Sequence, residues 1–232
     1  MKKTFMIIGL GRFGSCVAKV LAQNKCDIIA VDKDDKSVRD VSKIINNCVI
    51  ADSTSLTVLQ DLDAGKVDHA VVAIGNNLQA SILTIINLKK LGVKKITVRA
   101  DDLAYQEVFE ALGATDVIIP EESSAYSLGN QIMSDNVLDY YGVSANYAMA
   151  KVVVGKQFEP KNLIELNLRA LFDVNIVGII RNNIFFIPKG TDTIDPNDVV
   201  VVVGTGGKIA KLDEFFNKVE VKKKETKSTS KK

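Results

Sequence analysis

At 232 residues, the chain is long enough for one large domain, or for a domain of about 130 residues and a smaller one. Its 47% hydrophobic and 25% charged residues are ordinary for a soluble protein with a buried core. The net charge is +2, but residues 218–232 hold seven lysines and two glutamates, so the rest is slightly acidic and nucleic acid is not an expected partner. We expect residues 220–232 to form a disordered tail, with contact to anionic lipid headgroups as the alternative.

Cysteine usage and hydropathy indicate the compartment. Cys16, Cys26 and Cys48 show no C-x-x-C spacing, and the one histidine, His69, has no cysteine nearby with which to bind a metal. Unpaired thiols are typical of a reducing cytosol. The first apolar run ends at Gly9, too early for a signal peptide, and no run approaches the roughly 18 apolar residues of a membrane span. We therefore expect a cytoplasmic protein that reaches a membrane only through a partner.

The first apolar run, residues 5–8, leads into three glycines spaced G-x-G-x-x-G, and a helical pattern follows directly. Gly9 allows a tight turn, Gly11 lets a phosphate approach the backbone, and Gly14 lets the helix pack closely on the sheet. The start of such a helix offers free N–H groups and a positive dipole end to an anion. A second strand then ends at Asp32, about where an acidic residue binds a ribose hydroxyl. This context predicts a nucleotide site rather than a purely structural turn.

Short apolar runs alternate with amphipathic segments as far as residue 119. Strands that alternate with helices in this way form a doubly wound parallel sheet, so we expect a Rossmann-like α/β domain. The predicted strands are 5–10, 27–31, 48–51, 70–74, 96–98 and 116–119, and the predicted helices are 13–24, 35–45, 55–64, 78–91 and 103–112.

Ligands of such a sheet bind beyond the carboxyl ends of its strands. The residues expected there are small, polar or charged, as a nucleotide crevice requires, although turns are polar in any protein. They are Asp32, Lys33, Asp34, Asp52, Ser53, Ile74, Gly75, Asn76, Arg99, Ala100, Asp101, Pro120 and Glu121.

Pro120 interrupts the alternating pattern, and a smaller β-rich unit of α+β type follows. A helical pattern covers about 122–133, and the polar stretch 135–144 is interpreted as a linker. Asn182 and Asn183 predict a two-residue hairpin turn, since asparagine tolerates left-handed backbone angles. The density of isoleucine and valine predicts burial of both sides of this unit's sheet, one of them by a partner subunit. Its predicted strands are 148–154, 176–180, 184–187 and 199–203, and its predicted final helix is 208–217.

The sequence lacks the residues that hydride-transfer enzymes use for proton transfer. The second unit has no histidine and no paired carboxylates in an apolar run, and Tyr147 with Lys151 falls in an expected strand. Nucleophile elbows, zinc spacings and a Walker lysine are absent from the sequence as well. A nucleotide-binding protein that is not an enzyme is therefore the main hypothesis, and an NAD(P)-dependent oxidoreductase is the alternative.

Arg12 distinguishes this glycine turn from that of a dinucleotide site. A cation at the helix start would neutralise the distal phosphates of ATP or ADP, whereas a dinucleotide buries its pyrophosphate there and needs no extra arginine. ATP or ADP is therefore expected in preference to NAD(H). Glu121 cannot face phosphate directly, so we expect it to act through Mg²⁺ or another cation that takes oxygen ligands from a carboxylate and from phosphates.

Several motifs resemble those of the cytosolic regulatory subunits, of RCK/TrkA type, of bacterial Ktr/Trk potassium uptake systems. The resemblance covers nearly the whole chain up to the lysine-rich tail. It implies an RCK N-terminal nucleotide-binding domain over 3–119, a crossover helix or linker over 120–135, and a C-terminal TrkA-C ligand-binding domain over 136–219. The motifs that carry it are Gly9-Leu10-Gly11-Arg12-Phe13-Gly14, Val31-Asp32, Ala73-Ile74-Gly75, Pro120-Glu121, Asp135-Asn136-Val137-Leu138, Leu166-Asn167-Leu168-Arg169, Asn175-Ile176 and Asp195–Val201.

The same resemblance implies partners and ligands. It implies an octameric ring of this chain, with paired C-terminal domains, docked on a membrane-embedded potassium transporter subunit at the inner face of the cell membrane. It also implies that ATP activates where ADP does not, and that cyclic di-AMP can bind between paired C-terminal domains. The residues carried over for the nucleotide are Gly9, Gly11, Arg12, Phe13, Gly14, Asp32, Lys33, Asp34, Asp52, Ser53, Ile74, Gly75, Asn76, Arg99, Ala100, Asp101, Tyr105 and Glu121, with Glu121 also the metal position. Those for cyclic di-AMP are Ile164, Leu168, Arg169, Asn175, Ile176 and Pro188.

Overall fold

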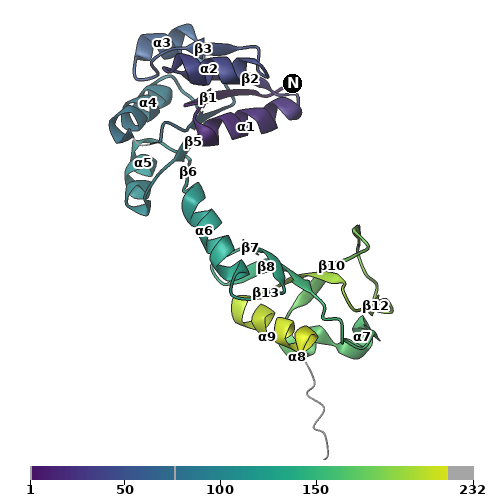
Figure 1. Cartoon of the computed structure of the whole chain (residues 1–232). Helices are drawn as coiled ribbons and strands as arrows, with labels where there is room; N and C mark the ends of the chain where they lie inside the picture. The colour runs from purple at the N-terminus through teal and green to yellow at the C-terminus, as the bar shows by residue number, and fades with distance from the viewer. Residues whose placement is uncertain (1, 76, 219–232) are drawn as a thin grey trace, which may run out of the picture. The chain divides into compact units, whose positions relative to one another are not determined.

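The computed structural model describes residues 2–75 and 77–218, so the expectations for Asn76 and for the tail over 220–232 lie outside the described residues. The chain splits into two compact units, Met1–Glu122 and Ser123–Lys232 (Figure 1). Each unit has its own sheet and its own hydrophobic core. Within the described ranges, no helix combines the length and the apolar character that a membrane crossing needs.

The first unit contains a six-stranded sheet in which all neighbouring strands pair in parallel, in the order β3-β2-β1-β4-β5-β6. The strand order reverses between β1 and β4, which is the topology of a doubly wound fold. The fold class expected from the sequence is thus confirmed. The elements are β1 (Thr4–Ile8), α1 (Arg12–Gln23), β2 (Asp27–Asp32), α2 (Asp35–Ser42), β3 (Cys48–Ile50), α3 (Leu56–Asp61), the 3-10 turn η1 (Ala64–Lys66), β4 (His69–Val72), α4 (Leu78–Lys90), β5 (Ile96–Arg99), the 3-10 turn η2 (Leu103–Tyr105), α5 (Gln106–Leu112) and β6 (Asp116–Ile118).

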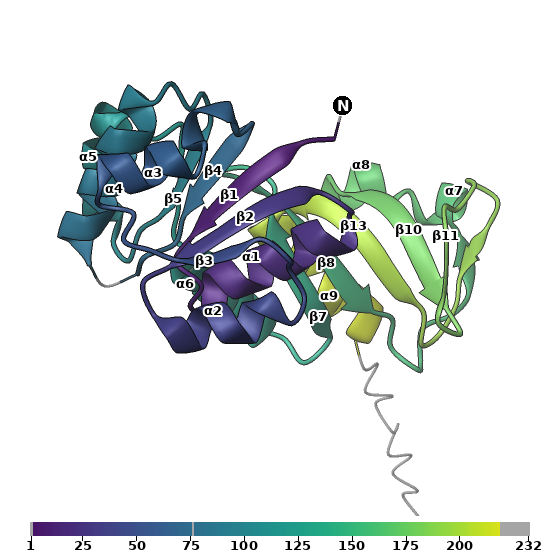
Figure 2. The ribbon, with the colours of Figure 1, turned by 90° about the horizontal axis from the view of Figure 1, so that it is seen from above.

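Helices cover both faces of this sheet, α1 and α2 on one face and α3, α4 and α5 on the other (Figure 2). Successive side chains of a strand point to opposite faces, so Ile7 of β1 packs with α1 and α2 while Met6 and Ile8 pack with α3 and α4. A parallel strand covered on both faces therefore needs apolar residues at nearly every position. This requirement explains why short continuous apolar runs were sufficient to predict the strands.

The turn after β1 requires glycine for two separate reasons. Gly9 has a φ of +92°, and a Cβ there would lie 2.5 Å from the carbonyl oxygen of Ala73. A Cβ on Gly14, in the first turn of α1, would lie 1.9 Å from the carbonyl oxygen of Gly9. Both glycines therefore let α1 and β4 approach the turn closely, as the G-x-G-x-x-G spacing predicted.

The second unit is built on a five-stranded sheet in the order β11-β10-β13-β8-β7, with all neighbouring strands antiparallel. The strands β9 and β12 pair in antiparallel orientation and form a separate, two-stranded sheet in the same unit. The α+β class expected for this unit is confirmed. The elements are β7 (Val137–Gly142), β8 (Tyr147–Val153), β9 (Lys161–Asn162), α7 (Leu163–Leu166), α8 (Leu168–Phe172), β10 (Asn175–Arg181), β11 (Ile184–Phe186), β12 (Thr193–Ile194), β13 (Val199–Thr205) and α9 (Gly206–Asn217), preceded by α6 (Pro120–Gln131), which starts in the first unit.

The interpretation of 135–144 as a linker was wrong. This stretch contains β7, an edge strand that pairs with β8. Val137 and Tyr140 of β7 are buried in the core of the second unit, while Asp139 forms an ion pair with Lys151 of β8. The polar residues around β7 concealed this strand in the sequence, because only its alternate side chains reach the core.

The hairpin between β10 and β11 has the predicted turn, with Asn182 and Asn183 at φ values of +52° and +63°. Burial of the sheet is less complete than the isoleucine and valine density predicted. Val200 and Val202 are fully buried with α9 in the core, whereas Ile184 and Phe185 of β11 are exposed. In the part of the chain that the structure describes, α8 and α9 contribute to the core beside this sheet, and burial of its exposed side chains by a partner subunit stays a prediction.

Candidate nucleotide-binding site

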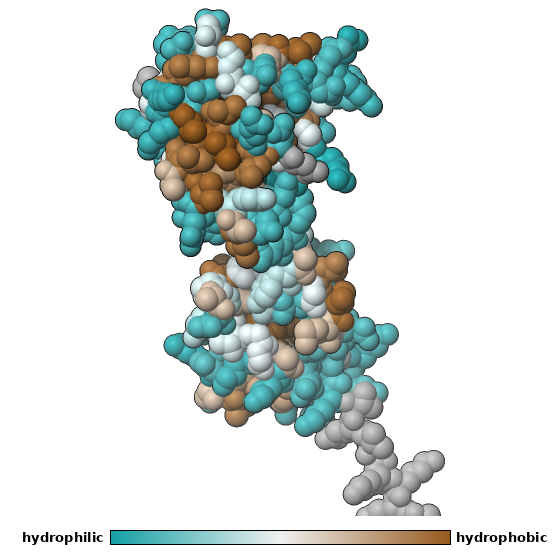
Figure 3. All heavy atoms as spheres, turned by 90° about the vertical axis from the view of Figure 1, so that its left-hand side faces the viewer, coloured by the Kyte–Doolittle hydropathy of each residue, from teal (hydrophilic) through white to brown (hydrophobic). Residues whose placement is uncertain are grey.

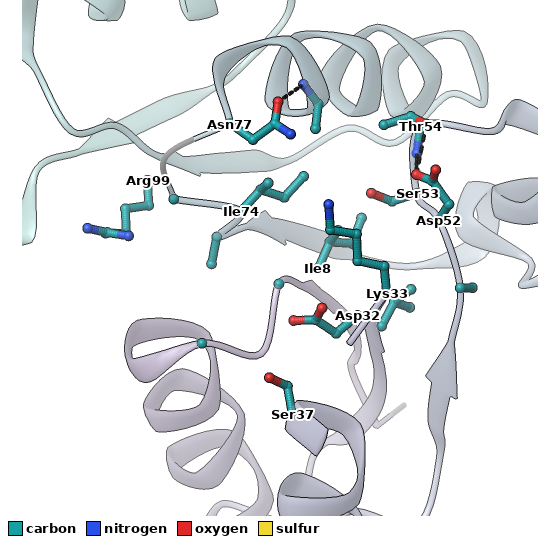
Figure 4. Close-up of a pocket in the computed structure, with 17 residues that line it drawn as sticks. Ile8, Asp32, Lys33, Ser37, Asp52, Ser53, Thr54, Ile74, Asn77 and Arg99 are labelled. Carbon is teal, nitrogen blue, oxygen red and sulfur yellow. Dashed lines mark hydrogen bonds between the residues drawn. The ribbon is translucent and has the colours of Figure 1, made fainter. Parts of the chain in front are cut away.

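A cavity of about 410 Å³ lies at the carboxyl ends of the strands of the first unit (Figure 4). Its position is the one that doubly wound sheets use for ligands, next to the reversal of strand order between β1 and β4. The lining combines apolar strand ends with polar side chains from the loops that follow them. It consists of Ile8, Gly9, Gly11, Val31, Asp32, Lys33, Ser37, Ala51, Asp52, Ser53, Thr54, Ala73, Ile74, Gly75, Asn77, Ala80 and Arg99.

The glycine turn provides one wall of this cavity and the start of α1. The residue before α1 is Gly11, which has no side chain to cap the helix, and no atom lies within 4 Å of where its Cβ would be. The N–H groups of the first turn of α1 are therefore available to an anion at a positive dipole end. Arg12, the first residue of α1, is exposed. Arg12, Phe13 and Gly14 do not line the cavity in the part of the chain that the structure describes.

Asp32, at the end of β2, lines the cavity and organises its loops. One carboxylate oxygen accepts the backbone N–H of Leu10 over 2.5 Å, and the other accepts the backbone N–H of Asp34 over 2.9 Å. A carboxylate can accept about four hydrogen bonds, so two lone-pair positions remain for the hydroxyls of a ribose. The side chain is thus held in place before any ligand arrives.

The next loops contribute side chains in different ways. Lys33 and Asp52 line the cavity, and hydrogen bonds from the backbone N–H and the hydroxyl of Thr54 lower the pKa of the Asp52 carboxyl. Ser53 also lines it, but this residue is buried and its hydroxyl is already hydrogen-bonded to Thr84 of α4 at 2.9 Å. Asp34 instead caps α2 by accepting the N–H and the hydroxyl of Ser37, and it lies outside the described lining.

Arg99, at the end of β5, forms the far side of the cavity. Its Nη2 donates to Oε1 of Glu121 over 2.7 Å and lies 3.0 Å from Oδ1 of Asp101. Its Nε is buried and has no hydrogen-bond partner among the described residues. The pKa of the Glu121 carboxyl is lowered, first by a hydrogen bond from its own backbone N–H and then by Arg99 and, more weakly, Arg12. Glu121 itself is exposed at the start of α6.

A second cavity of about 340 Å³ adjoins the first, since Gly75 and Arg99 line both. The predicted nucleotide residues Ala100, Asp101 and Tyr105 line this second cavity and not the first. The structure therefore brings nine predicted residues around the first cavity: Gly9, Gly11, Asp32, Lys33, Asp52, Ser53, Ile74, Gly75 and Arg99. Among the described residues, Arg12, Phe13, Gly14, Asp34 and Glu121 line neither cavity.

Some lining residues were missed in the sequence. Ser37 lies in the first turn of α2, and Thr54 and Asn77 follow directly on predicted strand-end residues. Asn77 also caps α4 by accepting the N–H of Ala80. Extending each strand-end motif as far as the cap of the next helix would have found Thr54 and Asn77. Ser37 carries no such signal, because it reaches the cavity only through the packing of α2.

The residues expected to bind cyclic di-AMP lie in α7, α8, β10 and the segment after β11. Leu168 is buried in the core of the second unit, and Ile176 packs partly against the same core. Arg169 and Asn175 are exposed, as is Ile164, whose backbone N–H donates to the carbonyl of Gly190. Pro188 is half-buried. A cyclic dinucleotide site at these positions stays a prediction.

No group of three or more histidine, cysteine, aspartate or glutamate side chains within residues 2–75 and 77–218 is arranged to hold a metal ion. A cation at Glu121 would thus need ligand atoms from a bound phosphate, and this metal position stays a prediction.

Comparison with solved structures identifies proteins of the same fold. The chain superposes on the GsuK channel bound to NAD with a TM-score of 0.64 at 15% identity, over 93% of this chain and 39% of that one. GsuK bound to ADP gives a TM-score of 0.50 at 12% identity, over 59% of this chain and 36% of that one. The chain thus spans about two fifths of the length of these solved chains. At these identities the likeness concerns the fold alone.

Sequence comparison is more specific. A TrkA-N domain model matches residues 5–120, and a TrkA-C domain model matches residues 148–217. The Ktr system potassium uptake protein C of Bacillus subtilis is 37% identical over 92% of this chain and 97% of its own length. The Ktr system potassium uptake protein A of the same organism is 32% identical over 87% of this chain and 91% of its own length. These relatives are named as potassium uptake proteins and not as enzymes, in agreement with the main hypothesis from the sequence. The chain therefore belongs to the Ktr/Trk family of potassium uptake proteins, which join a TrkA-N domain to a TrkA-C domain.

Proposed function

We propose that this chain is the nucleotide-binding regulatory subunit of a potassium uptake system and that it gates a membrane-embedded transporter subunit. The observation that carries the proposal is the cavity at the carboxyl ends of the parallel strands, in a chain of this family, with Asp32 and Gly11, the residue directly before α1, on its wall. These two features match the phosphate and the ribose of a nucleotide. The protein acts at the inner face of the membrane through its transporter partner.

The nucleotide is an adenine nucleotide, with ATP as the activating ligand and ADP as its competitor. The ribose lies against Asp32, and the phosphates lie along the first turn of α1. Arg12 is the exposed cation at that turn, and an arginine can bond the oxygens of a terminal phosphate in pairs. ATP differs from ADP only by this terminal phosphate, so the groups that reach it decide which nucleotide activates. A ligand shifts a conformational equilibrium only by its differential affinity for the two states.

A divalent cation such as Mg²⁺ fits beside Glu121. Mg²⁺ takes oxygen ligands from one or two carboxylates together with phosphates and waters. The lowered pKa of Glu121 keeps its exposed carboxylate ionised and ready to bind a cation. Arg99 holds this carboxylate, so a cation would have to share or replace that ion pair.

The chain assembles with copies of itself, in an octameric ring as the family resemblance implies. Apolar side chains that are exposed in this chain gather on α4, η2 and α5, and Figure 3 shows a large hydrophobic area on the side of the molecule where α4 and α5 lie. Leu83, Leu103 and Val108 belong to these elements. An apolar area that is continuous and rimmed by polar residues is typical of an interface between subunits.

The proposal is tested by calorimetry on the purified chain with ATP, ADP, NAD⁺ and NADH, followed by co-purification with the transporter subunit encoded by the same organism. We expect both adenine mononucleotides to bind in the range of cellular concentrations and the chain to remain with the transporter through purification. Potassium flux through the reconstituted complex should rise with ATP and not with ADP. If only the dinucleotides bind, the oxidoreductase alternative is favoured. If the potassium flux changes with neither ATP nor ADP, the proposed gating role is wrong.

A further inference from the structure

Two cavities share Arg99 as part of their wall. The first, of about 410 Å³, is the proposed site for the nucleoside and its phosphates. The second, of about 340 Å³, lies beyond Arg99 beside β5, η2 and α5, and its lining includes Leu78, Asp102, Tyr105 and Phe109. In Figure 4 Arg99 lies on the opposite side of the view from Asp52, with its guanidinium turned away from the Asp32 region. Its side chain therefore stands where the two cavities meet.

Ion pairs hold Arg99 in this position. Its Nη2 is bonded to Glu121 at 2.7 Å and lies 3.0 Å from Asp101. Glu121 belongs to the start of α6, and Asp101 belongs to the loop after β5. Only 17% of the side chain is exposed. Gly75 passes close by, since a Cβ on it would lie 3.2 Å from Nη1 of Arg99. A guanidinium with two acidic partners and little room is a fixed part of the wall rather than a freely moving surface cation.

The buried Nε shows that this arrangement has a cost. The atom has no hydrogen-bond partner among the described residues, and a buried donor without a partner destabilises a folded protein. The two carboxylates offset this cost at the other end of the guanidinium. The ion pairs with Asp101 and Glu121 therefore set the position of Arg99, although this position leaves its Nε without a hydrogen bond among the described residues.

The second cavity has the chemistry of a nucleoside site. Doubly wound sheets consist of two halves, and a dinucleotide lies across the reversal of strand order with one nucleoside on each half. Most residues that line the first cavity come from the half with β1, β2 and β3, although the loop after β4 and Arg99 also line it. The second cavity is lined only by residues from the half with β4 and β5 among those described. Tyr105 and Phe109 offer aromatic and apolar contact for a base, and the carboxylates of Asp101 and Asp102 can accept the hydroxyls of a ribose.

From this geometry we infer that Arg99, held by Asp101 and Glu121, restricts the site to mononucleotides by separating the first cavity from the second. A mononucleotide needs only the first cavity and the start of α1. The second nucleoside of a dinucleotide has to enter the other cavity past the guanidinium and displace it from its carboxylates. This inference rests on the proposed function, because it presupposes that the first cavity binds a nucleotide.

The test compares ADP and NADH on the full-length chain and on its Arg99→Ala variant, with calorimetry for both ligands. The measured quantity is the ratio of the NADH and ADP dissociation constants, which cancels any loss of phosphate binding common to both ligands. We expect this ratio to fall at least about tenfold in the variant, equivalent to ~1.4 kcal/mol. Arg39→Ala is the matched control, since Arg39 also pairs with an aspartate but is exposed on α2 and lines neither cavity.

Two further variants distinguish a specific role of Arg99 from a general loss of folding. Arg99→Gln shortens the side chain but keeps a donor, and it is used if thermal unfolding shows that the alanine variant is poorly folded. Glu121→Gln weakens the hold on Arg99 at a residue that lines neither described cavity, so it should shift the ratio in the same direction by a smaller factor. The inference is wrong if a folded Arg99 variant binds ADP and its ratio of NADH to ADP dissociation constants equals that of the wild type. It is also wrong if the wild-type chain binds NADH as tightly as ADP. Neither result contradicts the proposed function. A wild-type chain that binds neither ligand would overturn both.

Discussion

The carboxylate of Asp32 accepts the backbone N–H of Leu10 over 2.5 Å, and this bond joins the end of β2 to the glycine turn after β1. The same side chain accepts the N–H of Asp34 at the start of the next loop. Asp32 therefore positions two loops of the cavity and still offers lone pairs to a ligand. A residue with both roles should affect the affinity for every nucleotide that uses the cavity.

We accordingly expect Asp32→Ala to weaken ATP and ADP to a similar extent. The loss of two hydrogen bonds to a charged acceptor costs about 2–4 kcal/mol, and isothermal titration calorimetry measures it directly. Asp27→Ala is the control, since Asp27 lies at the opposite end of the same strand in an exposed ion pair with Lys2. An Asp32→Ala variant with wild-type affinity for ATP would show that the ribose lies elsewhere.

Arg12→Ala should reduce the preference for ATP over ADP more than it reduces the affinity for ADP. Arg12 is exposed at the first position of α1, where a terminal phosphate is the ligand group proposed to reach it. The measurement is the ratio of the two dissociation constants, with Lys19→Ala on the exposed side of the same helix as control. The same ratio in variant and wild type would remove Arg12 from the discrimination.

Alanine substitutions at two glycines of the turn should have different effects, one mainly on thermal stability and the other mainly on ATP binding. Gly14→Ala places a Cβ 1.9 Å from the carbonyl oxygen of Gly9, and overpacking of this kind costs about 1–3 kcal/mol or more. Gly11→Ala meets no atom within 4 Å, so it should unfold at a temperature closer to that of the wild type. It should nevertheless bind ATP more weakly, because the new methyl group occupies the approach of a phosphate. Thermal unfolding with and without ATP distinguishes the two effects, and equal loss of stability in both variants would contradict this division.

The stability of the first unit should decrease below neutral pH because of His69, the one histidine of the chain. Burial, with Lys95 as a second cause, lowers the pKa of His69 below its ordinary value of 6.5 in the folded state. The unfolded chain thus binds the proton more readily, so the contribution of His69 is complete above about pH 6.5 and is lost as the pH falls toward the folded pKa. Urea unfolding between about pH 8 and pH 5 should give a smaller decrease for His69→Gln than for the wild type. Parallel curves would assign the decrease to other groups.

The cyclic di-AMP prediction is tested on the full-length chain. A symmetric ligand suits a two-fold axis between paired C-terminal domains, because each half then meets the same residues. We expect a dissociation constant below about 100 μM, near 5.5 kcal/mol of affinity, and a marked loss in Arg169→Ala, since Arg169 is the exposed cation of the predicted set. Lys161→Ala, another exposed cation of the same unit, is the control. Binding that survives Arg169→Ala would remove that residue's role, and absence of binding would remove the site.

The sequence by itself determined the architecture of the first unit and most of the loops that line its cavity. Each strand of a doubly covered parallel sheet needs a continuous apolar run, and the turn after β1 admits only glycine at two positions, so both features are visible in the residues alone. The Asn182-Asn183 hairpin was predictable for the same reason, because its backbone angles limit which residues fit.

Tertiary structure decided what depends on packing between distant segments. β7 is a strand because β8 lies beside it and the core receives Val137 and Tyr140, although polar residues precede it and Asp139 interrupts its apolar side chains. Ser53 turns inward because Thr84 of α4 offers a partner across 31 positions of the chain. Arg99 meets Glu121 only after β6 has brought the start of α6 to the end of β5, and the same arginine lines both cavities. Contacts of this kind depend on distances in space, which local residue patterns do not encode.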